Sequence, residues 1–291
     1  MIAPARIGVD VGGSGVEAVA LASDGSVVAH ARIPTELGEA GIVRSVLAAV
    51  DAVGGPAATI GIGIPGRIAG GRVSDAVNLG VRELDLAAAI SHRTGSRVVV
   101  DNDVRAAALG ASVRRGAQNL AYLNLGTGVA AGIVIGGHVV DGSSGVAGEI
   151  GHLSIDPRGP RCACGQRGCV EVFAGGGSIA RRAGEPVERV AARAEAGDAA
   201  AREILADLAR GAAAGVRALA LAVDPELIMI GGGIARRGEK LRAEIAAELA
   251  RAAEGSAFLA ALRLEDRIEI VSPDEAIGAI GAALVGDRLI G

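Results

Sequence analysis

Apolar residues alternate with other residues at the start of the chain and then recur at helical spacing. Ile7, Val9 and Val11 occupy every second position, which is the pattern of a strand with one buried face. Two more apolar runs lie on either side of the turn Asp24-Gly25, so the pattern predicts a β-meander. A run with a shared apolar face then predicts a helix over residues 37–53. The further elements expected before residue 116 are a strand at 59–64, a loop, a helix at 84–92, a strand at 97–100 and a helix from about residue 103.

The opening strand-turn-strand pattern recurs about a hundred residues later. Residues 9–16 (Val-Asp-Val-Gly-Gly-Ser-Gly-Val) are similar to residues 123–129 (Leu-Asn-Leu-Gly-Thr-Gly-Val) with one gap, and an apolar strand follows each. Such an internal repeat predicts two related α/β domains that face each other across a cleft. We expect these domains at 1–116 and 117–274, with the C-terminal helix in 275–291 a candidate to pack back on the first.

The second half also mixes strands and helices, so the predicted fold class is α/β. After its hairpin the sequence predicts an irregular cysteine-bearing loop at 152–173 and alanine-rich helices to residue 223. The remaining expected elements are a buried strand at 227–230, the run Gly231-Gly232-Gly233, a helix at 240–253, a strand at 267–271 and a final helix at 275–288.

The composition excludes several classes of protein. The 29 basic and 33 acidic side chains leave a formal charge of −4, which argues against a polybasic surface for nucleic acid. Aromatic residues are 1% of the chain and Trp is absent, so a bound carbohydrate would be held by hydrogen bonds. Lys240 is the only lysine and follows no glycine-rich loop, which excludes a P-loop and disfavours a lysine Schiff base.

No targeting or membrane segment is expected. Arg6 and Asp10 interrupt the first apolar segment, so it does not resemble a signal peptide. The one charge-free stretch of membrane length lies between Arg115 and Asp141. Its pattern changes at Gly126, which favours two strands and a turn over a spanning helix. We therefore expect a cytoplasmic protein.

The two glycine hairpins are candidate phosphate-binding loops. Short glycine turns leave backbone N–H groups unobstructed, and several such groups pointing one way bind an anion without a lysine. Asp10, just before the first turn, is placed to hold Mg²⁺ through water. The alternative is a pair of plain hairpin turns, but their recurrence in register favours phosphate binding. The GxGxxG-like stretches at 61–66 and 126–131 open no predicted helix, which disfavours a Rossmann dinucleotide site.

His152, Cys162, Cys164 and Cys169 form a second candidate site. Four soft or borderline ligands at this spacing, with glycines beside them, fit a tetrahedral and therefore structural Zn²⁺. The alternative is three buried thiols and a core histidine. A redox pair is less favoured because Cys-x-Cys lacks the two-residue spacer of Cys-x-x-Cys.

Asp101-Asn102-Asp103 lies where a predicted strand ends and a helix begins. Ligands of open α/β sheets usually bind at such junctions, and an Asp there can accept a proton from a substrate hydroxyl. The alternative is that Asp103 or Asn102 only caps the helix.

Together these stretches resemble the ROK family, which comprises sugar kinases and related repressors. The family has the two-lobed actin-like ATPase fold, a duplicated ribonuclease H-like fold with an interlobe cleft, and the resemblance covers residues 6–285. It implies that Asp103 is the catalytic base. It implies that the nucleotide and its phosphates are bound by Asp10, Gly12, Gly13, Ser14, Gly126, Thr127, Gly128, Gly231, Gly232 and Gly233. It implies sugar contacts from Gly66, Asn78, Asn102, Asp103, Glu149, His152 and Glu171.

Four positions depart from the family pattern. Ser14 stands where Thr is usual, and Val81 where glucokinases often carry an aromatic residue. Gly15 stands where many members have Lys or another polar residue, and this form is also typical of polyphosphate glucokinases. Arg105 replaces a common Asn. Its guanidinium is expected to lower the pKa of the catalytic base or to contact an unusual substrate.

The resemblance implies an ATP- and Mg²⁺-dependent kinase, with a structural Zn²⁺, that phosphorylates a hexose at the 6-hydroxyl, most simply glucose. Alternatives are a kinase for fructose, mannose or N-acetylmannosamine, and a polyphosphate-using glucokinase. Two more distant alternatives are a silent sugar-binding protein and a transcriptional regulator. A regulator would carry a helix-turn-helix before the first hairpin, and the strand that starts near Arg6 leaves no room for one. The implied partners are the small-molecule sugar and nucleotide, no nucleic acid, no membrane, and a second copy in a homodimer.

Overall fold

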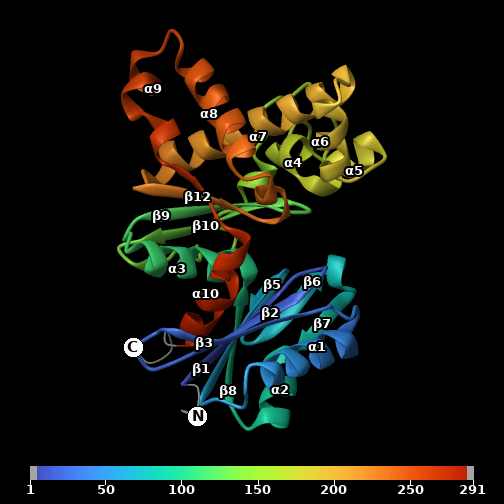
Figure 1. Cartoon of the computed structure of the whole chain (residues 1–291), viewed down its shortest axis with the longest axis vertical. Helices are drawn as coiled ribbons and strands as arrows, with labels where there is room; N and C mark the ends of the chain where they lie inside the picture. The colour runs from blue at the N-terminus through green and yellow to red at the C-terminus, as the bar shows by residue number, and fades with distance from the viewer. Residues whose placement is uncertain (1–4, 287–291) are drawn as a thin grey trace. The chain divides into compact units, whose positions relative to one another are not determined.

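Two units, each built on a mixed sheet, account for the described residues 5–286 of the computed structural model (Figure 1). Unit 1 comprises residues 5–116, 137–141 and 276–286, and unit 2 comprises 117–136 and 142–275. Among the described residues, no helix combines the length and the apolar character needed to cross a membrane.

The main sheet of unit 1 has the order β3-β2-β1-β4-β8. Strand β1 pairs antiparallel with β2 and parallel with β4, and β4 pairs parallel with β8. A second sheet has the order β5-β6-β7. The strands are β1 (Arg6–Val11), β2 (Val16–Leu21), β3 (Val27–Ile33), β4 (Thr59–Ile64), β5 (Arg67–Ala69), β6 (Arg72–Ala76), β7 (Val81–Asp85) and β8 (Arg97–Asn102). The helices are α1 (Glu39–Ala52), the short η1 (Val77–Leu79), α2 (Leu86–Thr94), α3 (Asp103–Arg115) and α10 (Ile277–Val285).

The two faces of β1 and β4 pack against different parts of unit 1. Ile7, Val9 and Val11 of β1 join the core that includes α1 and α2. The opposite face carries glycines, and a Cβ on Gly8 or Gly61 would lie within 2 Å of a backbone oxygen of α10. Helix α10 therefore packs directly on the sheet backbone, on the same face of β1 as Asp10.

The sheet of unit 2 repeats this order of pairing. It runs β10-β9-β12-β13; β9 pairs antiparallel with β10 and parallel with β12. The strands are β9 (Leu120–Leu125), β10 (Val129–Ile135), β12 (Leu227–Gly231) and β13 (Ile268–Ile270), and the two-residue β11 (His138–Val139) belongs to unit 1. The α-helices are α4 (Val170–Ala174), α5 (Gly176–Ala183), α6 (Val187–Glu195), α7 (Ala199–Val223), α8 (Glu239–Ala253) and α9 (Ala257–Leu262). The 3₁₀ turns are η2 (Ile150–His152), η3 (Gly233–Arg237), η4 (Leu264–Asp266) and η5 (Pro273–Glu275).

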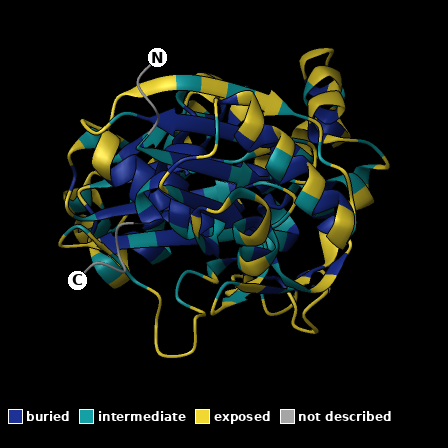
Figure 2. Ribbon diagram, turned by 90° about the horizontal axis from the view of Figure 1, so that it is seen from below, coloured by how far each residue is buried: buried dark blue, intermediate teal, exposed yellow. Residues whose placement is uncertain are grey.

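The buried residues follow the strands and the inner faces of the helices (Figure 2). In unit 2 the core joins β9, β10 and β12 to one face of the 25-residue helix α7, which presents Leu208, Ala212 and Val216 among others. With Leu205 and Leu219, which are also buried, the spacing is three and four residues, as in an amphipathic helix on a sheet.

The repeated strand-turn-strand unit is confirmed, because β1-β2 and β9-β10 occupy equivalent places in their sheets. The loop expected after residue 64 is wrong, since β5, β6 and β7 form a sheet there. The helix expected at 84–92 begins later, at Leu86, because Asp85 caps it by accepting a hydrogen bond from the Ala88 N–H at 3.1 Å. The cysteine loop ends earlier than expected, at the start of α4. The expected end of the last helix, Arg288, lies outside the described residues.

Candidate active site

Asp10 and Asp103 meet at the carboxyl edge of the unit 1 sheet. Asp10 is the penultimate residue of β1, and Asp103 is the first residue of α3, directly after β8. Two glycines leave space between them. A Cβ on Gly63 would lie 3.4 Å from Asp103 Cα and 3.8 Å from Asp10 Oδ1, and one on Gly278 would lie 2.3 Å from Asp10 Oδ2. Gly63 and Gly278 are therefore part of the site, although the sequence reasoning did not single them out.

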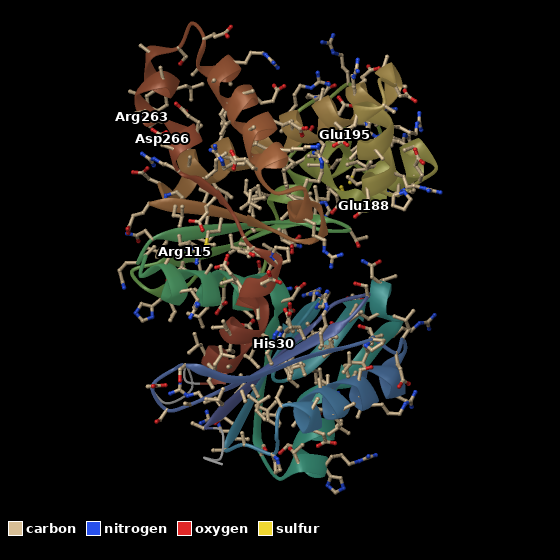
Figure 3. All side chains as sticks on the ribbon, viewed as in Figure 1. His30, Arg115, Glu188, Glu195, Arg263 and Asp266 are labelled. Carbon is tan, nitrogen blue, oxygen red and sulfur yellow. The ribbon has the colours of Figure 1, made fainter. Side chains whose placement is uncertain are left out.

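The surroundings of Asp10 disfavour its charge. Burial, followed by the charges of Asp103 and Glu17, raises the pKa of Asp10 from 3.8 to about 8, and Arg32 acts in the opposite direction. Glu17 Oε1 in turn lies 3.0 Å from Nε2 of His30 on β3 (Figure 3). A cation bound here would relieve the repulsion among these carboxyl groups, and carboxylate oxygens are donors that suit Mg²⁺.

In Mg²⁺-free buffer, Asp10→Asn is expected to stabilise the protein more at high pH than at low pH. Below about pH 4 the carboxyl group is protonated in the folded and unfolded states alike. Between about pH 4 and 8 only the unfolded state releases the proton, so the folded state loses stability as the pH rises. Urea unfolding should show that the variant's free energy of unfolding exceeds that of the wild type by about 1–3 kcal/mol at pH 8 and by little at pH 4.5. A gain that does not change with pH would contradict this origin.

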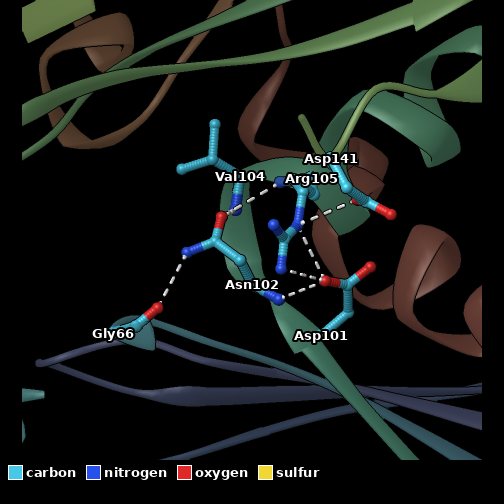
Figure 4. Close-up of polar contacts among 6 residues, drawn as sticks. All are labelled: Gly66, Asp101, Asn102, Val104, Arg105 and Asp141. Atoms are coloured by element: carbon cyan, nitrogen blue, oxygen red, sulfur yellow. Dashed lines mark hydrogen bonds and ion pairs between the residues drawn. The ribbon is translucent and has the colours of Figure 1, made fainter. Parts of the chain in front are cut away.

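The turn from β8 into α3 is held by side-chain hydrogen bonds. Asn102 caps α3: its Oδ1 accepts from the N–H groups of Val104 (3.0 Å) and Arg105 (3.2 Å), as the capping alternative proposed (Figure 4). Its Nδ2 points to Gly66 O at 3.5 Å. The structure thus brings together Asn102 and Gly66, two of the residues expected to contact sugar.

Arg105 braces the same turn from the side. Its Nε donates to Asp101 Oδ1 at 2.8 Å, and its Nη2 lies 2.7 Å from the same oxygen. Asp101 Oδ1 also accepts from the Asn102 N–H at 2.7 Å, and Asp141 Oδ1 lies 3.5 Å from Arg105 Nε (Figure 4). Arg105 and Asp101 are both largely buried, so this ion pair fixes the backbone that carries Asn102 and Asp103.

The remaining sugar candidates of unit 1 differ in their surroundings. Gly66 has a φ of +110°, and a Cβ there would lie 2.7 Å from Ser74 O, so this position requires glycine. Asn78 lies in η1 with its side chain exposed.

The first hairpin is closed by backbone and anchored by a threonine. The Gly12 N–H donates to Gly15 O at 2.9 Å, and Thr35 Oγ1 donates to Gly12 O at 2.6 Å. Gly13 and Ser14 are exposed at its tip. These hydrogen bonds hold the hairpin in place at Gly12, while the backbone at its tip is exposed to solvent.

The second hairpin, in unit 2, is braced by a helix start and a carboxylate. Gly126 N–H donates to Gly128 O at 3.0 Å, and the N–H groups of Gly176 and Gly177 donate to Gly126 O and Thr127 O, each at 2.8 Å. Glu171 Oε2 accepts from the Val129 N–H at 3.1 Å and would lie 2.5 Å from a Cβ on Gly128. The run Gly175–Gly177 is a contributor that the sequence reasoning missed.

The triple glycine after β12 meets this hairpin through Asn124. Gly231 pairs in register with Asn124, and Gly232, at φ +87°, would place a Cβ 2.6 Å from Asn124 Oδ1. Gly232 precedes η3, which starts at Gly233. A Cβ on Gly126 would lie 3.2 Å from Asn124 Nδ2, so the structure brings Gly126, Gly231 and Gly232 together around one asparagine.

His152, Cys162, Cys164 and Cys169 converge in unit 2. One ligand atom of each lies within 4.8 Å of the others, and Cys164 Sγ lies 3.7 Å from Cys169 Sγ. Tetrahedral Zn²⁺ with Zn–S bonds of about 2.3 Å separates its sulfurs by about 3.8 Å, so the residues fit the metal. Burial raises the pKa of Cys169, whereas hydrogen bonds from Gln166 lower the pKa of Cys164. Binding of a cation is therefore expected to release a proton from Cys169.

Gln166 and Glu149 flank this cluster. Gln166 Nε2 donates to His152 O at 3.1 Å and approaches Cys164 Sγ at 3.5 Å, so it ties two ligand-bearing segments together. Glu149 Oε2 lies 4.0 Å from His152 Nε2, and both side chains are exposed. The metal candidate and two of the sugar candidates are therefore neighbours.

These features agree with the comparisons to known proteins. The ROK family model matches residues 6–287, and the chain belongs to the ROK family. It is 35% identical to a glucokinase of Halalkalibacterium halodurans over 87% of this chain and 88% of that protein. A ROK family glucokinase from Streptomyces griseus, solved with glucose and AMPPNP, superposes with a TM-score of 0.80 at 29% identity, covering 97% of this chain and 99% of that one. A ROK hexokinase from Thermus thermophilus has a TM-score of 0.81 at 28% identity, with 98% of each chain covered. The predicted actin-like ATPase fold is thereby confirmed.

Proposed function

We propose that this protein is an ATP-dependent sugar kinase of the glucokinase type, which transfers the γ-phosphoryl group to the 6-hydroxyl of glucose. The observation that carries the proposal is the convergence of Asp10 and Asp103 at one sheet edge, in a chain that is similar to glucokinases over most of its length. Phosphoryl transfer needs one carboxylate to receive the hydroxyl proton and another near the cation that accompanies the phosphates.

Asp103 is the proposed base. Its carboxylate accepts the proton of the 6-hydroxyl while that oxygen forms a bond to the γ-phosphorus, and the bond from phosphorus to the bridging oxygen breaks so that ADP leaves. The Oδ1 of Asn102 already accepts the hydrogen bonds of the helix cap. Its Nδ2, next to Gly66 O, is therefore the group that donates to a sugar oxygen. The Arg105–Asp101 pair holds both residues in place.

The donor is assigned to the glycine segments. Gly12, Gly13 and Ser14 in unit 1 and Gly126, Thr127 and Gly128 in unit 2 bind phosphate oxygens through backbone N–H groups. Gly231–Gly233 contact the adenosine. Asp10 would hold the Mg²⁺ that accompanies the donor, and the ion would neutralise part of the phosphate charge.

The sugar contacts of unit 2 follow the family resemblance. Glu149 and His152 bind sugar hydroxyls. His152 and the three cysteines would hold Zn²⁺, which would fix the orientation of the imidazole. Glu171 has one oxygen committed to the Val129 N–H, which leaves the other for a hydroxyl. We also propose that the protein is cytoplasmic, as its sequence pattern indicates, and that it forms a homodimer, as the family resemblance implies.

A panel of sugars and donors tests the function. Initial rates with glucose, fructose, mannose and N-acetylmannosamine, each with ATP or polyphosphate, are expected to give the highest kcat/KM for glucose with ATP. A higher value for another hexose would reassign the substrate, and a higher value with polyphosphate would reassign the donor. Sugar binding without phosphorylation of any acceptor would mark a silent sugar-binding protein and reject the proposal.

A further inference from the structure

Arg32 of β3 lies over the first glycine hairpin. Strands β2 and β3 pair so that Val16 faces Ile33 and Glu17 faces Arg32. A Cβ built on Gly15 would lie 3.3 Å from Arg32 Nε and 3.9 Å from Arg32 Cγ. The side chain of Arg32 therefore borders the space that a side chain at position 15 would enter.

The guanidinium of Arg32 acts on the Asp10 carboxyl group only through space, without a direct contact. Its side chain is exposed, and within residues 5–286 it forms no hydrogen bond or ion pair. Glu17, its partner in the strand register, instead lies 3.0 Å from His30. Arg44, Arg72 and Arg105 of the same unit form ion pairs, whereas Arg32 and Arg93 form none within residues 5–286. Arg32 thus differs from Arg93 in its place: its positive charge lies beside the hairpin and is not held in an ion pair.

The hairpin itself offers donors on the same loop. Gly12 uses its N–H within the turn, whereas the N–H groups of Gly13, Ser14 and Gly15 donate to no acceptor in the described part of the chain. Successive free N–H groups with a guanidinium beside them match an anion with several oxygens. A guanidinium suits phosphate better than a lone ammonium would, because its planar N–H groups can bind two oxygens at once.

We propose that Arg32 binds the phosphate chain of the donor at the Gly12–Gly15 hairpin, supplying from β3 the positive charge that residue 15 lacks. The identity of the donor rests on the proposed function. The chemistry is that of a condensed phosphate, which ATP and inorganic tripolyphosphate share. Arg32 is thus a donor-binding residue contributed by a strand outside the hairpin motif.

Direct binding measurements on Arg32→Ala test this assignment. Isothermal titration calorimetry without sugar is expected to show a Kd about 10- to 100-fold higher for both Mg-ATP and Mg-tripolyphosphate, because a charge-assisted hydrogen bond is lost. The Kd for glucose should not change. Arg93→Ala is the matched control, since Arg93 is an exposed arginine of α2 with no ion pair in the described chain. Its Kd values should equal those of the wild type.

A second substitution separates charge at the hairpin from loss of structure. Gly15→Lys in the Arg32→Ala background is expected to restore at least half of the lost binding free energy. Residue 15 has no positive φ, and truncation of Arg32 removes two of its three close contacts, so the Cβ has only to shift by a few tenths of an ångström from Ile33 O at 3.3 Å. Failure of that rescue would overturn the assignment, as would unchanged Kd values in Arg32→Ala or a weakening confined to ATP. These measurements need no turnover. A wild type that phosphorylates no sugar would reject the proposed function, and the Kd ratios would still decide the role of Arg32.

Discussion

Asp103→Asn is expected to lower kcat with glucose and ATP by about 10²- to 10⁴-fold while the protein still folds and binds sugar. The amide has the shape of the carboxylate but cannot accept the hydroxyl proton, so only the transfer step loses its base. The loss of a negative charge at the first residue of α3 costs about 0.3–1 kcal/mol of helix stability, too little to unfold the protein. ADP release measures kcat, and calorimetry measures the Kd for glucose.

Asp85→Asn is the matched control for this substitution. Asp85 also stands at the start of a helix in unit 1, where it caps α2, and asparagine caps helices equally well. The control should therefore retain kcat and unfold at nearly the wild-type temperature. If Asp103→Asn instead kept wild-type turnover, the proton would have to leave by another route and Asp103 would not be the base.

The local features of this site could be predicted from the sequence because they depend on short spacing. Each of these features lies within a few strands or one loop: the two glycine hairpins, the junction at Asp103 and the His152–Cys169 cluster. Residue types and spacing within so short a segment already limit how its side chains can be arranged. The convergence of the four possible zinc ligands is an example, since all of them fall within 18 residues and the loop between them is rich in glycine.

Features that depend on distant pairing could not be predicted in this way. Gly63 and Gly278 are more than 200 residues apart and face Asp10 only because α10 packs on the glycine face of β1 and β4. The sheet β5-β6-β7 was missed because its strands are of three to five residues and their apolar alternation is too short to be distinguished from a loop. The sequence left open whether Asp103 or Asn102 caps the helix, and the positions of the Val104 and Arg105 N–H groups identify Asn102 as the cap.

Loss of the metal from the cysteine cluster is expected to weaken glucose binding as well as the fold. The segment around Cys162, Cys169 and Val172 forms only a small apolar cluster, so a bound Zn²⁺ is expected to contribute on the order of 10 kcal/mol to its folding. Cys164→Ser removes one exposed ligand without touching the proposed sugar contacts Glu149 and His152. We expect metal analysis to fall from one zinc per chain to near zero, and the KM for glucose to rise about 10- to 100-fold with a smaller change for ATP.

Two histidine variants complete this test. His152→Asn should lose zinc and glucose affinity together, whereas His138→Asn, which changes a histidine of β11 outside the cluster, should lose neither. Thermal unfolding of each variant with and without added Zn²⁺ separates a missing ligand from a misfolded chain, because only the protein that can still bind the ion gains stability from it. Zinc loss in Cys164→Ser with an unchanged KM for glucose would show that the metal stabilises only the loop. The orientation of the His152 imidazole would then not depend on the metal.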